Sequence, residues 1–163
     1  MGLGVRLDAK ARVIVAERDE RIVGVLTYAD APACSAIDLR EVYTMARVAG
    51  PRIVRAFRIF AKVDRAHPKT PHWHLQGVGV DPASQGQGIG RALVDEFVRG
   101  CDEARQDGYL ETITFTDQSK PSLTRYYERY GFEVSYEESM GDDWSLVSMT
   151  RPVVDPDAAT SDG

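Results

Sequence analysis

A glycine-rich stretch between a strand-like run and a long helical pattern constrains the fold more than any other feature. Residues 72–80 (HWHLQGVGV) have strand character, and a turn at residues 81–84 leads to three closely spaced glycines, Gly86, Gly88 and Gly90. Apolar residues then repeat every four positions, which predicts a helix over residues 88–107; they are Ile89, Leu93, Phe97 and Cys101. The first turn of a helix has unpaired N–H groups and a partial positive charge, and glycines let a ligand approach it. The stretch therefore predicts a phosphate or pyrophosphate site.

Two well-known phosphate loops differ from this stretch. A Walker loop requires Gly-Lys followed by Ser or Thr, which is absent here. A dinucleotide fingerprint requires GxGxxG, whereas residues 86–90 read GxGxG, and its acidic residue should end the next strand, whereas Glu111 lies near the start of one. A glycine-rich connection without a ligand is the other alternative. This alternative leaves the three glycines unexplained, because glycine destabilises a helical turn relative to alanine.

The patterns outside this stretch predict one α/β domain over residues 1–151. Two β-branched runs form a hairpin, and six further elements precede or follow the glycine stretch. The expected elements are strands 12–17 and 22–28, helices 38–48 and 51–65, strand 109–116, helix 122–130, and strands 132–136 and 144–150. Strands and helices mix without strict alternation, which predicts a three-layer α/β protein with a mixed sheet. Residues 152–163 are expected to form a disordered acidic tail.

Composition narrows the classes of function. The chain has 163 residues, with 20 Lys and Arg against 25 Asp and Glu, a net charge of −5 and a pI near 5.2. This balance argues against a dedicated nucleic-acid or anionic-membrane surface. The N-terminus lacks the apolar core of a signal peptide, and Cys34 and Cys101 read as reduced thiols, so a cytoplasmic location is expected. His72 and His74 share one face of their strand, but no Cys or acid lies nearby in the sequence, so no metal site is predicted.

Residues 85–90 (QGQGIG) fit the pattern Arg/Gln-x-x-Gly-x-Gly/Ala, which resembles the coenzyme A pyrophosphate loop of the GNAT superfamily of N-acetyltransferases. Flanking segments resemble the superfamily as well: residues 80–82 (VDP) precede the loop, and residues 126–132 (YYERYGF) resemble its "YE-x-x-GF" motif. Residues 67–75 (HPKTPHWHL), together with residues 110–112 (LET), resemble the puromycin N-acetyltransferase branch. The resemblance extends over about residues 12–151.

The resemblance implies a fold, a co-substrate and a set of site residues. The fold would be three-layered, with a central, mostly antiparallel mixed sheet splayed at the cofactor site. Acetyl-CoA would donate an acetyl group to a small-molecule amine, which attacks the thioester directly. The pantetheine and thioester would be lined by Val78, Gly79 and Val80, and the pyrophosphate would be held by Gln85, Gly86, Gln87, Gly88, Ile89, Gly90 and Arg91. Tyr127, the Tyr of the "YE" motif, would reprotonate the leaving thiolate, although a packed helical Tyr is the alternative.

The acceptor amine must attack in its neutral form. Deprotonating an alkylamine from bulk water at pH 7 costs about 4–5 kcal/mol, so a nearby carboxylate would help. Glu111 is the candidate for this general base, because it stands in an otherwise apolar strand between Leu110 and Ile113. A strand-edge or salt-bridged Glu is the alternative reading.

The chain also departs from the superfamily pattern. Members usually have another strand and one or two helices before the hairpin, whereas only eleven residues precede residue 12. The sequence therefore predicts an N-terminally short member that lacks these elements. A non-catalytic module that binds CoA or a partner protein is the second hypothesis. Expected partners are a small-molecule amine and, as an option, a second copy of the chain, with neither nucleic acid nor membrane.

Overall fold

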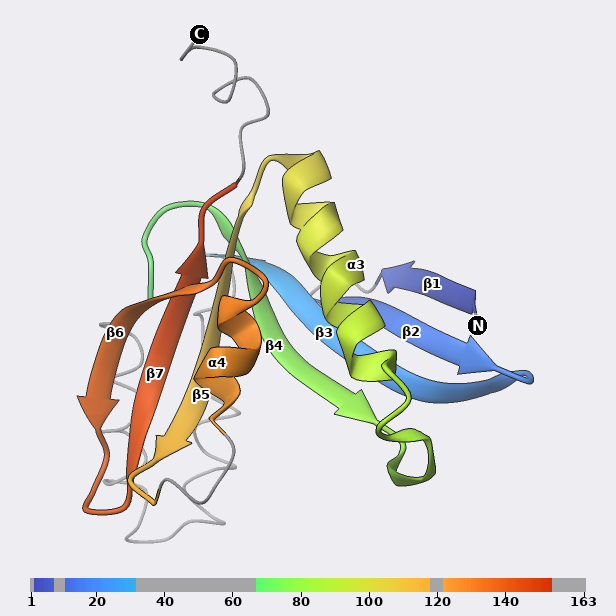
Figure 1. Ribbon diagram of the computed structural model, residues 1–163. Coiled ribbons are helices and arrows are strands. Elements are labelled where there is room, and N and C mark those ends of the chain that lie inside the picture. Colours follow the sequence, from blue (N-terminus) through green and yellow to red (C-terminus); the bar gives the residue numbers. More distant parts are fainter. Residues whose placement is uncertain (1, 8–10, 32–66, 118–121, 154–163) are drawn as a thin grey trace, which may run out of the picture.

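A computed structural model describes residues 2–7, 11–31, 67–117 and 122–153 (Figure 1). These residues form seven strands, two α-helices and a 3-10 turn. In chain order they are β1 (Gly2–Leu7), β2 (Arg12–Arg18), β3 (Arg21–Ala31), β4 (His72–Val80), η3 (Pro82–Ser84), α3 (Ile89–Ala104), β5 (Asp107–Phe115), α4 (Leu123–Glu128), β6 (Glu133–Ser139) and β7 (Trp144–Arg151). The expected helices 38–48 and 51–65, Cys34 and the tail from residue 154 lie outside the described residues.

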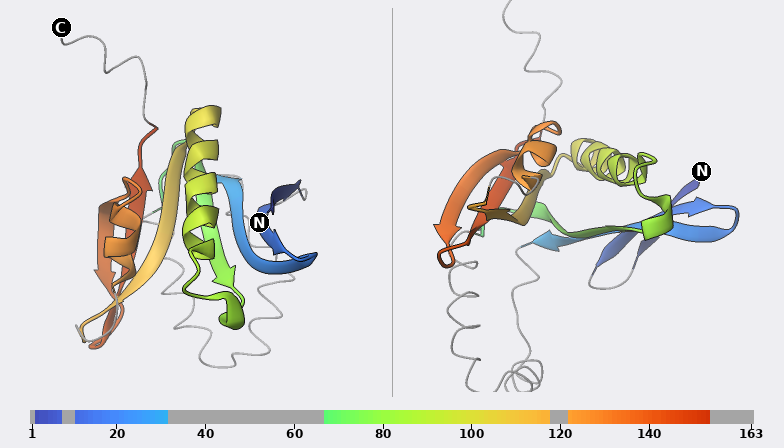
Figure 2. Two further views of the ribbon diagram at one scale, coloured as in Figure 1. Left: turned by 45° about the vertical axis from the view of Figure 1, so that its right-hand side comes forward. Right: turned by 60° about the horizontal axis from the view of Figure 1, so that its bottom comes forward.

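All seven strands belong to one sheet, in the order β1-β2-β3-β4-β5-β7-β6. Neighbours are antiparallel except β4 and β5, which are parallel. Helices α3 and α4 cover the same face of this sheet (Figure 2). The prediction of an α/β fold with a mixed, mostly antiparallel sheet is therefore confirmed. Among the described residues, no helix has the length and apolar character needed to cross a bilayer.

The prediction that the first strand begins at residue 12 is wrong, because β1 precedes it and pairs with β2 from Gly2↔Glu17 to Leu7↔Arg12. The sequence GLGVRL has two glycines and little β-branched character, so its local propensity is weak. Its strand conformation is set by pairing with the edge of β2, a partner that periodicity along one segment does not reveal.

Helix α3 packs its apolar face on the centre of the sheet. Its buried residues are those of the predicted repeat, together with Val94: Ile89, Leu93, Val94, Phe97 and Cys101. The aromatic partners of this face come from the strands, with Trp73 and Tyr28 both in contact with Phe97. Burial raises the pKa of the Cys101 thiol to about 12, so it stays protonated in this core.

Strands β4 and β5 separate partway along their length, which Figure 1 shows as a divergence toward their C-terminal ends. Their pairing extends only from His72↔Asp107 to Leu75↔Leu110, although β4 continues to Val80 and β5 to Phe115. At the same point the β3–β4 register shifts, because Thr27 pairs with Gly77 while Tyr28 pairs with Leu75. The extra residue, Gln76, is a β-bulge on β4. The predicted splay of the sheet is therefore present, and it begins at this bulge.

Candidate active site

The segment from β4 to α3 folds into a tight loop anchored at its start. The Asp81 N–H donates to the Val23 carbonyl oxygen at 2.9 Å, which ties the loop to β3. The Ser84 hydroxyl is buried and donates to the Asp81 carboxylate at 3.2 Å. This turn directs residues 85–88 to the N-terminus of α3, the position that the sequence predicts for an anion.

The backbone of this loop leaves its amides open. Gly86 and Gly88 have φ values of +75° and +80°, and Gly88 is the left-handed N-cap of α3. The side-chain amides of Gln85 and Gln87 donate to the carbonyl oxygens of Val80 (3.2 Å) and Ala83 (3.4 Å), so neither occupies a loop N–H. Within the described part of the chain, the N–H groups of residues 86–91 have no hydrogen-bond acceptor. A row of free donors at a helix N-terminus is what a pyrophosphate requires.

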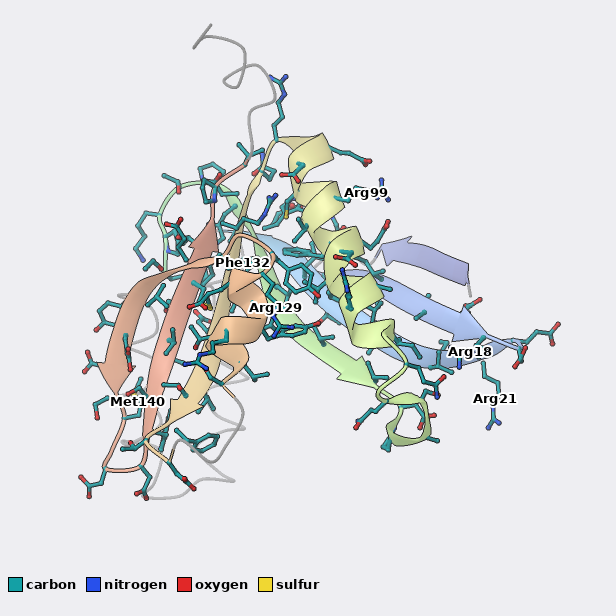
Figure 3. The ribbon with its side chains drawn as sticks, in the orientation of Figure 1. Arg18, Arg21, Arg99, Arg129, Phe132 and Met140 are labelled. Carbon is teal, nitrogen blue, oxygen red and sulfur yellow. The ribbon has the colours of Figure 1, made fainter. Side chains whose placement is uncertain are left out.

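Positive charge lies next to these amides. Arg18, at the end of β2, donates to the side-chain oxygen of Gln87 across the gap between hairpin and loop. Figure 3 shows Arg18 and Arg21 at the tip of the hairpin. Arg91, in the first turn of α3, has a side chain that is 79% exposed and lies 3.7 Å from the Asp95 carboxylate. The sequence analysis did not identify Arg18, because its position beside the loop depends on the β2–β3 hairpin.

Beyond the bulge, the edge of β4 that faces β5 pairs with no strand in the described part of the chain. This is where Val78, Gly79 and Val80 lie, while their other edge pairs with β3 from Leu26 to Gly24. Val78 and Val80 pack against the core. An extended chain can add hydrogen bonds to such an edge. The predicted pantetheine residues therefore occupy a strand edge that leads directly to the loop.

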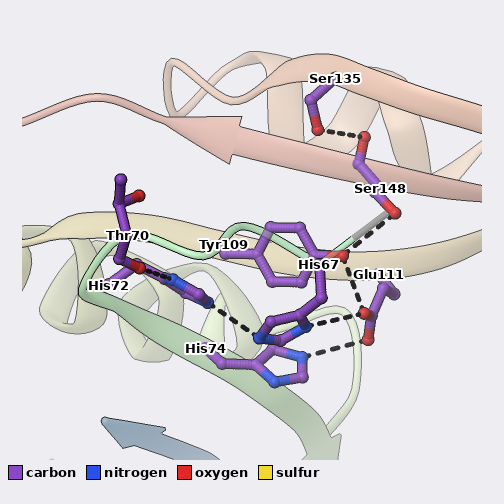
Figure 4. Close-up of polar contacts among 8 residues, drawn as sticks. All are labelled: His67, Thr70, His72, His74, Tyr109, Glu111, Ser135 and Ser148. Carbon is purple, nitrogen blue, oxygen red and sulfur yellow. Dashed lines mark hydrogen bonds and ion pairs between the residues drawn. The ribbon is translucent and has the colours of Figure 1, made fainter. Parts of the chain in front are cut away.

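Glu111 lies at the start of the divergence, surrounded by histidines and a tyrosine (Figure 4). One carboxylate oxygen, Oε1, accepts a hydrogen bond from the Tyr109 hydroxyl at 2.8 Å and lies 3.5 Å from His67 Nδ1. The other, Oε2, lies 3.1 Å from His74 Nε2. The Glu111 side chain is 18% exposed. The role of Glu111 as general base stays a prediction, and its contacts with His67 and His74 have the salt-bridge geometry of the alternative reading.

The surroundings of Glu111 favour its charged form. Burial raises the pKa of its carboxyl, but the hydrogen bond and charge of His74, followed by the Tyr109 hydroxyl, together hold it below its usual value. Burial lowers the pKa of His67, and the neighbouring Glu111 only partly opposes this. Burial also lowers the pKa of His72. An ionised Glu111 beside neutral His67 and His72 is therefore the resting state at neutral pH.

Glu111 and Tyr127 lie on opposite faces of the sheet. Side chains alternate along a strand, and Leu110 belongs to the core under α3, so Glu111 projects from the other face. Tyr127 lies on α4, which packs on β5 from the helix side, and its ring is 6.1 Å from that of Phe132. Burial raises the pKa of the Tyr127 hydroxyl, which keeps it a proton donor. The two predicted catalytic side chains thus lie on the two faces of β5.

Sequence reasoning missed several members of the site. Tyr109 and Ser148 were not expected in it, and their hydroxyls lie 3.1 Å apart. Tyr126 has its hydroxyl 4.0 Å from the position of a Cβ on Gly90, in the first turn of α3. The histidines gather at Glu111, yet among the described residues no group of three or more His, Cys, Asp or Glu side chains is arranged to hold a metal ion.

Known proteins similar to this chain are acetyltransferases. The sequence profile described as "Acetyltransferase (GNAT) family" matches residues 4–132. A mycothiol acetyltransferase of Streptosporangium roseum is 36% identical over 69 residues, which are 42% of this chain but only 20% of that protein. A glucosamine 6-phosphate N-acetyltransferase of Trypanosoma brucei brucei is 30% identical over 122 residues, which cover 68% of this chain and 78% of that protein.

Solved structures share the fold. The crystal structure of "histone acetyltransferase HPA2 and related acetyltransferase" from Corynebacterium glutamicum superimposes with a TM-score of 0.57 at 22% sequence identity. The match covers 91% of this chain and 67% of the other. No comparison singles out the puromycin branch, so that assignment remains a prediction.

Proposed function

Because the chain belongs to the acetyltransferase (GNAT) family, we propose that it transfers an acetyl group from acetyl-CoA to a small-molecule amine. The observation that carries this proposal is the row of N–H groups over residues 86–91 that lack an acceptor among the described residues and follow the free edge of β4 along the chain. The names of two relatives, a mycothiol and a glucosamine 6-phosphate acetyltransferase, support a small-molecule acceptor. A cytoplasmic location and a homodimer stay predictions.

The described residues fit acetyl-CoA at three places. The amides of residues 86–91 would bind the pyrophosphate oxygens, and Arg18 and Arg91 would add charge beside them. The free edge of β4 would pair with the pantetheine as an added strand. One N–H among residues 78–80 would then polarise the thioester carbonyl, a contribution worth about 3 kcal/mol where such a donor has been removed from other enzymes.

In the proposed reaction, the amine nitrogen bonds to the thioester carbonyl carbon as the C–S bond breaks. The amine gives its proton toward Glu111, whose carboxylate is ionised and stands at the divergence of β4 and β5. The departing thiolate takes a proton from the Tyr127 hydroxyl, which lies on the helix side of β5. Solvent returns both groups to their starting states. The family thus supplies the reaction type, and the positions of Glu111 and Tyr127 support the assignment of roles.

The test combines binding with turnover. Isothermal calorimetry measures CoA binding, and thiol release from acetyl-CoA is followed with a panel of amines that includes glucosamine 6-phosphate and simple alkylamines. We expect Glu111→Gln and Tyr127→Phe each to lower kcat/KM by about 10²–10⁴-fold, with little change in CoA affinity. Glu137→Gln, an exposed carboxylate of β6, and Tyr136→Phe, a tyrosine of the same strand, are the matched controls.

Binding and turnover together separate a transferase from a module that only binds CoA. A protein that binds no CoA would overturn the proposal. CoA binding without turnover on any amine would favour the non-catalytic module instead. Wild-type rates in Glu111→Gln or Tyr127→Phe would leave the transferase activity in place and overturn the role given to that residue.

A further inference from the structure

The hydrogen-bond order beside Glu111 determines which imidazole nitrogens carry hydrogen. His72 Nδ1 lies 2.8 Å from the Thr70 carbonyl oxygen, which can only accept, so this nitrogen is protonated. A neutral His72 therefore has its lone pair on Nε2, which lies 3.1 Å from His67 Nε2. His67 must donate this second bond. A neutral His67 consequently turns the lone pair of its Nδ1 toward Glu111.

The carboxylate offers no hydrogen in return. The Tyr109 hydroxyl donates to Oε1, and His74 Nε2 faces Oε2, so the ionised Glu111 is an acceptor on both oxygens. The His67 Nδ1 and Glu111 Oε1 atoms are therefore two acceptors 3.5 Å apart. A charge-assisted hydrogen bond would bring them to about 2.7–2.9 Å. The resting cluster thus contains one vacant proton position between His67 and Glu111.

We propose that His67 is a positioning residue that receives, through Glu111, the proton removed from the acceptor amine. This inference rests on the proposed function. The ammonium N–H bond breaks as an O–H bond forms on the Glu111 carboxylate. That O–H bond then breaks as His67 Nδ1 binds the proton, which leaves an imidazolium–carboxylate pair joined by one hydrogen bond. Solvent removes the proton before the next turnover, and no other reactant is consumed.

The different basicities of a carboxylate and an imidazole explain why His67 would take the proton from Glu111. An alkylammonium near pKa 10.4 transfers its proton to a carboxylate near 4.3 with an equilibrium constant of about 10⁻⁶, whereas an unperturbed imidazole near 6.5 accepts it about 100-fold more favourably. Burial lowers the pKa of His67 and makes this advantage smaller. Glu111 is a weak base by itself, since its pKa is held below the usual value. His72 cannot take the same part, because its Nδ1–H is already bound to Thr70.

Some of the charged and titratable groups around His67 lower its pKa and others raise it. Burial is the largest effect that disfavours a protonated His67, and His74 of β4 and Lys69 of the preceding segment act in the same sense. From β5, Glu111 favours it, while the Tyr109 ring packs edge-on against the imidazole at 4.7 Å. Removing the Glu111 charge should therefore lower the pKa of His67 further.

Nuclear magnetic resonance tests the proton positions without any need for turnover. The chain contains only three histidines, so ¹⁵N-histidine labelling gives three ring systems, each assigned by one substitution. At pH 8 we expect His67 as the Nε2–H tautomer and His72 as the Nδ1–H tautomer. In Glu111→Gln the pKa of His67 should fall. An Nδ1–H tautomer of His67 in the wild type would overturn the inference.

Kinetics tests the relay itself. In His67→Ala we expect kcat near pH 7 to fall about 100-fold and the KM for acetyl-CoA to stay unchanged. The acid limb of the kcat profile should shift to lower pH, because Glu111 alone then titrates. Imidazole added to the solution should restore part of the rate in His67→Ala and none in Glu111→Ala. Wild-type kcat and an unshifted limb in His67→Ala would overturn this inference alone. A wild type without turnover would overturn the proposed function and the relay step with it.

Discussion

Two alanine substitutions, placed two residues apart at the start of α3, should differ in their effect on the unfolding free energy. Gly88 has φ +80°, and a Cβ added there meets nothing within 4 Å. The cost of Gly88→Ala is therefore the left-handed backbone strain alone, about 1–2 kcal/mol of unfolding free energy. For a chain of this length that corresponds to a fall in Tm of about 2–8 °C. Gly90 lies inside α3, and its added Cβ would have ordinary contacts at 3.6 Å from Val80 and 4.0 Å from the Tyr126 hydroxyl.

Gly90→Ala should accordingly keep or raise the unfolding free energy, by at most about 1 kcal/mol, because alanine is the better helix former. Urea unfolding followed by circular dichroism gives both values. Gly88→Asn is the control, since asparagine tolerates the left-handed region better than alanine and should lose less. A Gly88→Ala protein as stable as wild type, or a Gly90→Ala protein that loses more than Gly88→Ala, would refute the backbone geometry from which the open amides are inferred.

Two further predictions concern stability. Arg151 is buried and forms a two-pronged ion pair with Asp102 at 2.7 and 2.9 Å, so Arg151→Met should cost about 2–4 kcal/mol of unfolding free energy, measured in urea; the partial exposure of Asp102 keeps the value below that of a fully buried pair. Acid should also destabilise the fold. The pKa values of His67 and His72 are lowered on folding, so these residues stabilise the fold above about pH 6.5. The pKa of Glu111 is lowered as well, so this residue stabilises the fold above about pH 4.3. These contributions are lost as the pH falls through the folded-state values, so the midpoint of urea unfolding should drop below about pH 6.5 through the two histidines and drop further below about pH 4.3 through Glu111.

Each of these has a matched control. Arg99, on the exposed side of α3 (Figure 3), pairs with Glu96 and Glu103, and Arg99→Met should leave the unfolding midpoint unchanged. The double variant His67→Asn and Glu111→Gln should show a shallower loss of stability with acid than wild type. A loss as steep as that of wild type would locate the titrating groups elsewhere.

The loop could be predicted from the sequence because its chemistry is local. The donors of residues 86–91, the turn at Asp81 and the start of α3 follow one another along the chain, so glycine spacing and helical periodicity are sufficient. The order of the elements from β2 onward follows from similarly local patterns. β1 was missed because its conformation depends on a partner strand rather than on its own residues.

The cluster around Glu111 could not be predicted in this way, because it is assembled by register. His74 lies near Glu111 because β4 and β5 pair with His74 opposite Tyr109. Ser148 lies near Glu111 because β5 and β7 pair with these two residues opposite each other. The hydrophobic periodicity of a single segment does not reveal how its residues align with those of a neighbouring strand. The sequence signal was only an acid in an apolar strand and two histidines on one face of another.

The bulge at Gln76 connects the two halves of the site. Without it, alternation from Leu75 would place Val78 on the Glu111 face; with the extra residue, Leu75 and Val78 both face α3. Beyond the bulge, the β4 residues that share the Glu111 face are Gly77 and Gly79, and neither has a side chain. A Cβ on either would meet only one β3 side chain, at 3.6 and 3.8 Å respectively. The same irregularity that ends the pairing of β4 with β5 thus clears a strip of backbone between the carboxylate and the loop. A thioester held along that strip would be reached by an amine from the Glu111 face without displacing any side chain of β4.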